Sequence, residues 1–272
     1  RDRSVSRGLG DVYKRQAGTV YVKELSTVSP YVIDSAAKTV TISINKTTTL
    51  NVENITAKGQ ICINKTAEQM TDAVESSSDY GTVYSPKYTE AGLAGCVFEV
   101  KDASGKTIAN LTTDANGYAE TGILKFGTYT VQEVSAVEGY AADDTVHTVT
   151  LAYQDQNTPI VKENISVKND RIPASVKIKK MTERWNQDEF VFEPCAGEGF
   201  VFGLYTAESI GILPKDTLVE LLTTDAEGSA ASAELPFGNY YLRELKVPDE
   251  TIYLSQISFP LSVSDVNTVY YD

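Results

Sequence analysis

Three stretches of the sequence share one pattern at nearly equal spacing, and this periodicity limits what the chain can fold into. The stretches read GTVYVKEL, GTYTVQEV and GNYYLREL, and each places a glutamate six residues after its first glycine. These glutamates, Glu24, Glu133 and Glu244, are 109 and 111 residues apart. A repeat of this length is one small domain, so the pattern predicts a tandem array rather than a single large domain.

Two further patterns mark the end of one repeat and the start of the next. LNVEN and ISVKN end at Asn54 and Asn169, whereas GQICINK and ASVKIKK end at Lys65 and Lys180. The members of each pair are 115 residues apart, and each asparagine precedes the next lysine by 11 residues. A complete repeat therefore has a lysine near its start, a glutamate, and an asparagine at its end.

These marks divide the chain. Residues 17–55 are predicted to be the C-terminal part of one repeat, residues 58–170 a complete repeat, and residues 174–272 a repeat that lacks its last strand. Residues 6–16 read SRGLGDVYKRQ, which a common transposase adapter can encode. We therefore expect residues 1–16 to be disordered, non-native read-through rather than a basic N-terminal arm. We also expect that the gene was cut at both ends, with any signal peptide and cell-wall anchor outside the fragment.

Short runs of threonine, valine, isoleucine and tyrosine, broken by glycine, aspartate and asparagine, predict an all-β fold. Repeats of roughly 110 residues with regular turn signals fit a small antiparallel, Ig-like β-sandwich. Two stretches have helical character, and one is the run TLVELL in the irregular segment Thr206–Leu222. We expect this segment to pack against the edge of its sandwich.

The recurring lysine, glutamate and asparagine each end an apolar strand face. Alternate residues of a strand point to the same side, so Lys65 shares its side with Ile61 and Ile63. Glu133 and Asn169 also follow an aliphatic residue two positions earlier, as do the copies in the other repeats: Glu24, Asn54, Lys180 and Glu244. Each residue alone could be a strand end that reaches solvent, but their recurrence in register favours burial. Buried charges need partners, so the three side chains should meet.

Two interpretations of such a meeting remain. The simpler one is a buried Lys–Glu ion pair with the asparagine as a hydrogen-bonding neighbour. The other is covalent, because burial disfavours the charged forms of an amine and a carboxyl group, and a neutral amine is a nucleophile. A protonated Glu133 could polarise the Asn169 carbonyl and pass protons to departing ammonia. The product would be an isopeptide bond between Lys65 and Asn169, formed once per molecule and assisted by Glu133, so the protein would not be an enzyme in the usual sense.

This constellation resembles the collagen-adhesin B-type and SpaA-type domains, which are prealbumin-like sandwiches of Gram-positive pilins and surface adhesins. The resemblance rests on the first-strand lysine, the G-x-Y-x-[VL]-x-E box, which reads Gly-x-Val in the first segment, and the closing V-x-N. It covers nearly all of residues 17–272. It implies stacked stalk domains in which a Lys–Asn bond joins the first and last strands, on an extracellular, cell-wall-anchored protein. The implied partners are neighbouring repeats of the same chain.

The outer repeats are expected to lack the bond. The first has Glu24 and Asn54 but no donor lysine. The last has Lys180 and its assisting Glu244, but its asparagine should lie just beyond Asp272. Asn267 is a weaker candidate, because its match to Asn157 places it in a turn.

Composition excludes several other functions. The net charge of −13 disfavours nucleic-acid partners, although an acidic surface also serves solubility. Three cysteines, Cys62, Cys96 and Cys195, with one histidine match no metal site, and we expect no metal and no cofactor. They are interpreted as small buried residues, with a Cys62–Cys96 disulfide as the alternative. No run is long and apolar enough to span a membrane, so no membrane contact is expected from this fragment.

A ligand-binding adhesin module is the main alternative function. The segment Glu75–Ala91, ESSSDYGTVYSPKYTEA, is predicted to be an inserted surface loop whose tyrosines could bind a host matrix protein or a glycan. An enzyme that acts on an external substrate is a third class, but the sequence contains no Ser-His-Asp set, metal cluster or phosphate loop.

Overall fold

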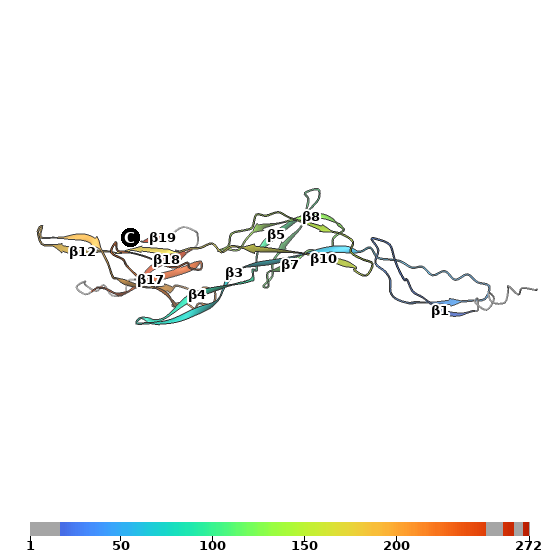
Figure 1. Ribbon diagram of the computed structural model, residues 1–272, viewed down its shortest axis with the longest axis horizontal. Helices are drawn as coiled ribbons and strands as arrows, with labels where there is room; N and C mark the ends of the chain where they lie inside the picture. Colours follow the sequence, from blue (N-terminus) through green and yellow to red (C-terminus); the bar gives the residue numbers. More distant parts are fainter. Residues whose placement is uncertain (1–16, 249–257, 264–268, 272) are drawn as a thin grey trace, which may run out of the picture.

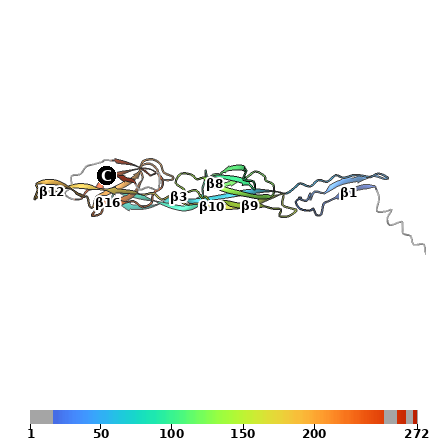
Figure 2. The ribbon, with the colours of Figure 1, turned by 90° about the horizontal axis from the view of Figure 1, so that it is seen from above.

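The computed structural model describes residues 17–248, 258–263 and 269–271, and within these residues the chain forms strands and no helix. The all-β prediction is therefore confirmed. Three regions follow one another along the longest axis, with β1 (Gly18–Val22) at one end and β12 (Met181–Asn186) at the other, and the molecule is thin in both views (Figures 1 and 2). The predictions for residues 1–16 and for Asn267 lie outside the described residues.

The N-terminal region is a small two-stranded sheet. In it β1 pairs antiparallel with β2 (Lys38–Ile42), and every residue of β1 is exposed. The chain then runs back toward the central region. There the backbone nitrogen of Ile33 donates a hydrogen bond of 2.9 Å to the carbonyl oxygen of Gln156, which ties the two regions together.

The central region is a sandwich of two sheets. One sheet has the order β10–β3–β4, with β7 also paired to β3, and the other has the order β6–β5–β8–β9. The core lies between them and contains Ile61, Ile63, Phe98, Val131 and Val167. The strands of the region are β3 (Lys58–Ser78), β4 (Gly81–Gly92), β5 (Val97–Asp102), β6 (Thr107–Thr112), β7 (Tyr118–Glu120), β8 (Gly127–Ser135), β9 (His147–Leu151) and β10 (Ile160–Asn169).

The first and last strands of the central sandwich, β3 and β10, lie side by side and parallel. Their register places Val167 opposite Lys65 and Asn169 opposite Ala67. Because alternate residues face the same side of a sheet, Lys65 and Asn169 both turn into the core. The pairing therefore positions the lysine and the asparagine, which are far apart in sequence, on neighbouring strands.

The C-terminal region repeats this plan. One sheet has the order β16–β11–β19, and the other has the order β15–β14–β17–β18. The strands are β11 (Val176–Lys179), β14 (Val201–Thr206), β15 (Leu218–Thr223), β16 (Ser229–Ala231), β17 (Gly238–Lys246), β18 (Ser258–Val263) and β19 (Val269–Tyr271). β12 and β13 (Val191–Ala196) form a separate hairpin.

β19 pairs parallel with β11, as β10 does with β3. β19 therefore occupies the place in the C-terminal repeat that β10 occupies in the central one. Val176 pairs with Val269, whereas its central counterpart Ile61 pairs with Glu163, so in this register the counterpart of Asn169 falls beyond Asp272.

Two local predictions are wrong. The TLVELL run forms β15 instead of a helix, because six residues are too few for a stable helix and β14 offers them a full ladder of hydrogen bonds. The segment 75–91 is a regular hairpin instead of a loop, because β3 continues to Ser78 and β4 pairs with it back to Gly92. Both segments had short or ambiguous apolar patterns, which tertiary pairing decides.

The three cysteines have free thiols, so the alternative Cys62–Cys96 disulfide is not formed. Across the described ranges, no helix has the length and apolar character needed to cross a membrane.

Candidate functional site: a buried lysine, glutamate and asparagine

Backbone hydrogen bonds on both sides of Lys65 fix its position in β3. Its nitrogen donates to the carbonyl oxygen of Gly117 at 2.7 Å, and its carbonyl oxygen accepts from the nitrogen of Leu93 at 2.9 Å. Gly117 has a φ of +73°, and a Cβ there would lie 2.0 Å from the Lys65 carbonyl oxygen. Only glycine allows this close approach, which fixes where the lysine side chain leaves the strand.

Glu133 and Asn169 come from two further strands that face Lys65. Glu133 lies on β8 in the opposite sheet, and Asn169 is the last residue of β10. The relative exposures of Lys65, Glu133 and Asn169 are 1%, 4% and 1%, so all three are withdrawn from water. Charged groups this deeply buried are rare unless they are paired, and here each has the other two as partners.

The three side chains form a closed triangle of contacts. Lys65 Nζ donates to Glu133 Oε2 at 3.1 Å and also to Asn169 Oδ1. Asn169 Nδ2 donates to Glu133 Oε1 at 2.8 Å. The ring of Phe98 closes one side, with its centre 5.9 Å from the lysine nitrogen. The amine is therefore held against the amide that it would attack, and the carboxylate contacts both nitrogens.

This arrangement differs in one respect from the mechanism expected from the sequence. Glu133 contacts the nitrogen of the Asn169 amide, while the carbonyl oxygen accepts from Lys65. The glutamate thus contacts both the lysine nitrogen and the amide nitrogen of Asn169. Polarisation of the carbonyl by Glu133 is not the arrangement seen.

Two residues of the site were not found by sequence reasoning. The backbone nitrogen of Asp143 donates to Glu133 Oε2 at 2.9 Å, which helps to fix the carboxylate. The Cys96 thiol lies beside Glu133, and burial, followed by its hydrogen bond to Glu133, raises the pKa of this thiol to about 11. The sequence does contain a signal for the Asp143 contact, because an aspartate follows both Glu24 and Glu133 by ten residues. Cys96 has no counterpart signal.

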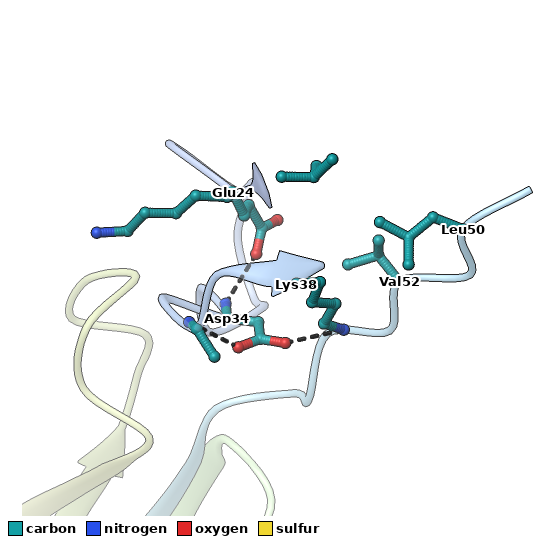
Figure 3. Close-up of a pocket in the computed structure, with 8 residues that line it drawn as sticks. Glu24, Asp34, Lys38, Leu50 and Val52 are labelled. Atoms are coloured by element: carbon teal, nitrogen blue, oxygen red, sulfur yellow. Dashed lines mark hydrogen bonds and ion pairs between the residues drawn. The ribbon is translucent and has the colours of Figure 1, made fainter. Parts of the chain in front are cut away.

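The N-terminal region contains the glutamate and asparagine half of the same site. Asn54 Nδ2 donates to Glu24 Oε1 at 2.8 Å, and the nitrogen of Asp34 donates to Glu24 Oε2 at 2.8 Å. Glu24 lies in a pocket of about 210 Å³, where Lys38 pairs with Asp34 at 3.0 Å (Figure 3). Both Glu24 and Asn54 are half-buried, since no lysine strand covers them in the part of the chain that the structure describes.

The C-terminal region contains the lysine and glutamate half. Lys180 Nζ lies 3.3 Å from Glu244 Oε1 and 4.6 Å from the centre of the Phe200 ring. The 3.3 Å separation is an ion-pair distance without hydrogen-bond geometry, and that buried oxygen has no hydrogen-bond partner among the described residues. The Lys180 side chain is 24% exposed, against 0% for Lys65.

Comparison with known families identifies a match to the SpaA prealbumin-like fold domain. The match is made twice, over residues 86–166 and 197–272, which together are more than half of the chain. No relative was found among curated protein sequences.

Among solved structures, the chain is similar to the Bacillus anthracis TIE protein, with a TM-score of 0.58 and 20% identity over 94% of this chain. It spans 41% of the length of that protein. A Streptococcal ancillary pilin has 20% identity over 94% of this chain and 74% of its own, with a TM-score of 0.30. The shaft pilin SpaA from Lactobacillus rhamnosus GG has 15% identity over 79% of this chain and 96% of its own, with a TM-score of 0.31.

Proposed function

Because the chain belongs to the family of SpaA prealbumin-like fold domains, we propose that it is part of the stalk of a bacterial cell-surface adhesin or pilin. We propose further that its central repeat closes an isopeptide bond between Lys65 and Asn169. The observation that supports this most strongly is the buried triangle of lysine, glutamate and asparagine side chains. A stalk function also agrees with the long, thin arrangement of the repeats (Figure 1).

The proposed reaction uses only the three side chains. The Lys65 ammonium first gives a proton to Glu133 through their 3.1 Å hydrogen bond, which produces a neutral amine and a neutral acid in a deeply buried site. The lysine nitrogen then attacks Asn169 Cγ and forms the new C–N bond. Glu133 passes this proton to Asn169 Nδ2, the old C–N bond breaks, and ammonia leaves. The new amide nitrogen gives its second proton to Glu133, which ends as the neutral acid.

Pre-organisation in the core would accelerate the proposed reaction. The packed strands hold amine and amide in contact, so an improbable encounter in water becomes a nearly unimolecular step. The reaction happens once in each molecule and consumes its own substrate. The chain is therefore proposed to modify itself and to act on no external substrate.

The bond would join the first and last strands, β3 and β10, across 104 residues of sequence. By analogy with a disulfide that closes a loop of this size, it would stabilise the fold by about 4–5 kcal/mol. Tension along the stalk would then pass through covalent bonds rather than through the hydrogen bonds between β3 and β10. Unlike a disulfide, the bond cannot be reduced.

We place the protein outside the cell, anchored in the cell wall, with the neighbouring repeats of its own chain as its main partners. Direct contact with host matrix proteins or glycans is a separate proposal, which would assign an adhesive role to the same fragment. Binding of the purified chain to an array of matrix proteins and glycans would test that role.

The intact mass of the purified chain tests the proposed bond. We expect a mass lower than that of the sequence by one ammonia, with Lys65 and Asn169 in one branched peptide after digestion. Glu133→Gln is the matched variant, because it preserves the shape of the side chain but cannot accept the lysine proton. The variant should have the unmodified mass, and an unmodified mass for the parent chain would refute the bond.

A further inference from the structure

A hairpin follows the lysine strand in both repeats of this chain, and we call this hairpin the arm. In the central repeat the arm is β3 from Thr66 onward together with β4, and in the C-terminal repeat it is β12 together with β13. The two arms are structurally equivalent. Each begins directly after the lysine, and the residue that follows its second strand, Leu93 or Gly197, donates its backbone nitrogen to the carbonyl oxygen of that lysine.

The central arm is packed on the next repeat. It extends beyond its own sandwich along the long axis and reaches the C-terminal region, where β4 lies against β15 (Figure 1). Met70, Ala73 and Tyr84 of the arm pack against the hydrophobic core of the C-terminal repeat. An isolated two-stranded hairpin is marginally stable in water, so this contact helps to hold the arm in shape.

The central arm packs on the segment Thr206–Leu222, the irregular stretch of the C-terminal repeat. The connection between β14 and β15 carries Ile210 and Leu213, which are 7% and 3% exposed and belong to that core. Gly211 lies between them, and a Cβ there would come within 2.6 Å of the Met70 side chain. The two insertions that interrupt the repeat pattern therefore meet each other. The central repeat has only a short turn, Asp102–Thr107, at the equivalent connection.

A third element links the arm to the connection between repeats. The Arg171 guanidinium stacks over the ring of Tyr88 in the arm at 4.0 Å and pairs with Glu234 of the C-terminal repeat at 2.6 Å. The arm, the linker and the next repeat are thus joined by one side chain. Together these contacts restrain the angle between the two repeats.

The C-terminal arm also carries apolar side chains, and no described residue covers them. Trp185, Phe190 and Phe192 are 44%, 75% and 63% exposed. The Trp185 ring meets the Phe192 ring edge-on at 5.1 Å and the Phe190 ring at 6.3 Å, so the three form one aromatic patch. The arm lies at the end of the molecule along the same axis (Figures 1 and 2). Contiguous exposed aromatic surface is a mark of an interaction site.

We propose that the arm is the device by which each repeat docks onto the following one, and that β12–β13 is an open arm whose partner is a further prealbumin-like repeat. The central arm is the closed arm, because it already packs on the repeat that follows it. The surface that it contacts shows what kind of surface the partner of the open arm would present. That partner repeat would carry an apolar loop at the position of residues 206–217, which lie between β14 and β15 in this chain. The inference rests on the proposed stalk function but is independent of the isopeptide bond.

The closed arm can be tested in the full chain by amide hydrogen exchange. Met70→Ser combined with Tyr84→Ser should speed exchange in residues 206–217 on the order of tenfold, because the loop loses its cover. Val74→Ser is the matched control, since Val74 lies on the same strand but is 54% exposed. Unchanged exchange in the loop of the double variant would overturn docking by the closed arm.

The open arm can be tested with Trp185, which is the single tryptophan of the sequence. The full chain is extended by a second copy of residues 170–272, in which W185F removes the second reporter. We expect blue-shifted emission and several-fold weaker quenching by acrylamide than in the unextended chain. I212D in the added copy should restore quenching, because Ile212 is half exposed and lines the surface that faces the closed arm.

Two results would overturn the proposal for the open arm. One is undiminished quenching of Trp185 while hydrogen exchange shows that the added copy is folded. The other is protection of Trp185 in the unextended chain that grows with its concentration, because the patch would then join two copies of the chain. Neither result changes the mass of the protein, so the isopeptide bond is judged separately.

Discussion

The central and C-terminal repeats place a lysine in the same backbone environment, yet the two lysines differ in burial and in their contact with the glutamate. Both lysines are clamped by a glycine with positive φ, Gly117 at +73° and Gly228 at +75°. The Lys65 side chain is completely buried and donates a hydrogen bond to Glu133, whereas Lys180 is 24% exposed and its glutamate oxygen has no hydrogen-bond partner in the part of the chain that the structure describes. The difference lies in the third partner, because Asn169 has no counterpart among the described residues of the C-terminal repeat.

The N-terminal region completes this comparison from the other side. Glu24 and Asn54 make the same 2.8 Å contact as Glu133 and Asn169, and no lysine of the described residues pairs with Glu24. The glutamate–asparagine pair and the lysine–glutamate pair therefore each form without the third residue. The site is assembled from two halves, and complete burial comes only when one fold supplies both.

The largest expected effect is loss of the bond through Asn169→Ala. This change removes the group that Lys65 is proposed to attack but leaves the lysine–glutamate pair, so it converts the central site into the C-terminal type. We expect a loss of about 4–5 kcal/mol in the free energy of unfolding of the central repeat, with the unmodified mass. Denaturant unfolding and intact mass measure the two effects. Asn54→Ala is the control and should leave the mass difference of the chain intact.

A smaller effect is expected from the glycines that clamp the two lysines. Gly117→Ala and Gly228→Ala each place a side chain at a left-handed backbone position, which costs about 1–3 kcal/mol. Cβ atoms there would also lie 2.0 Å and 2.3 Å from the lysine carbonyl oxygens. Only Gly117→Ala should also slow cross-linking, as measured by mass against time after refolding. Equal cross-linking rates in the parent and Gly117→Ala would show that the clamp does not position Lys65.

The ion pair of the C-terminal repeat should contribute little. Lys180→Met keeps most of the side-chain packing on Phe200 and removes a charge that water partly screens. We expect a change of about 0–1 kcal/mol in the unfolding free energy of that repeat. The fluorescence emission of Trp185 during denaturation would measure it. A loss as large as that caused by Asn169→Ala would mean that the half site is more tightly coupled than its geometry indicates.

The smallest effect concerns thiol reactivity, which reports local closure without altering the fold. Burial raises the pKa of Cys96 to about 11, so only about one thiol in a thousand is ionised at pH 8. Cys195 of the C-terminal repeat is only partly buried. Iodoacetamide at pH 8 should therefore label Cys195 first and Cys96 last, as measured by peptide mapping. Early labelling of Cys96 would indicate that the central site opens to solvent.

The burial of the three side chains could be predicted from the sequence because the repeats act as internal controls. Lys65, Glu133 and Asn169 end apolar faces, and their copies do the same in register, which predicted their burial. The all-β class and the SpaA-type family followed from the same patterns and are confirmed. The aspartate that follows both Glu24 and Glu133 by ten residues was the one signal for the Asp143 contact, and the hydrogen bond itself uses a backbone nitrogen, which any residue could supply.

The arm could not be predicted in this way. Residues 75–91 contain serine, glycine and proline among their tyrosines, a composition typical of a surface loop, yet they extend a hairpin that covers the next repeat. Met70 and Tyr84 look like scattered exposed residues until the surface that they contact is known. The TLVELL run likewise became β15 because its neighbour β14 supplied a ladder that a short helix cannot match.

The sequence by itself determined which residues recur, which faces of the strands are apolar, and which polar groups must therefore be buried together. These are consequences of period-two alternation and of the cost of burying an unpaired charge. Only the tertiary structure decided which atoms of the three side chains touch, and that two unrelated insertions pack on each other. Contacts between distant segments depend on strand pairing and on the spacing of whole repeats. Neither can be predicted from a local stretch of sequence.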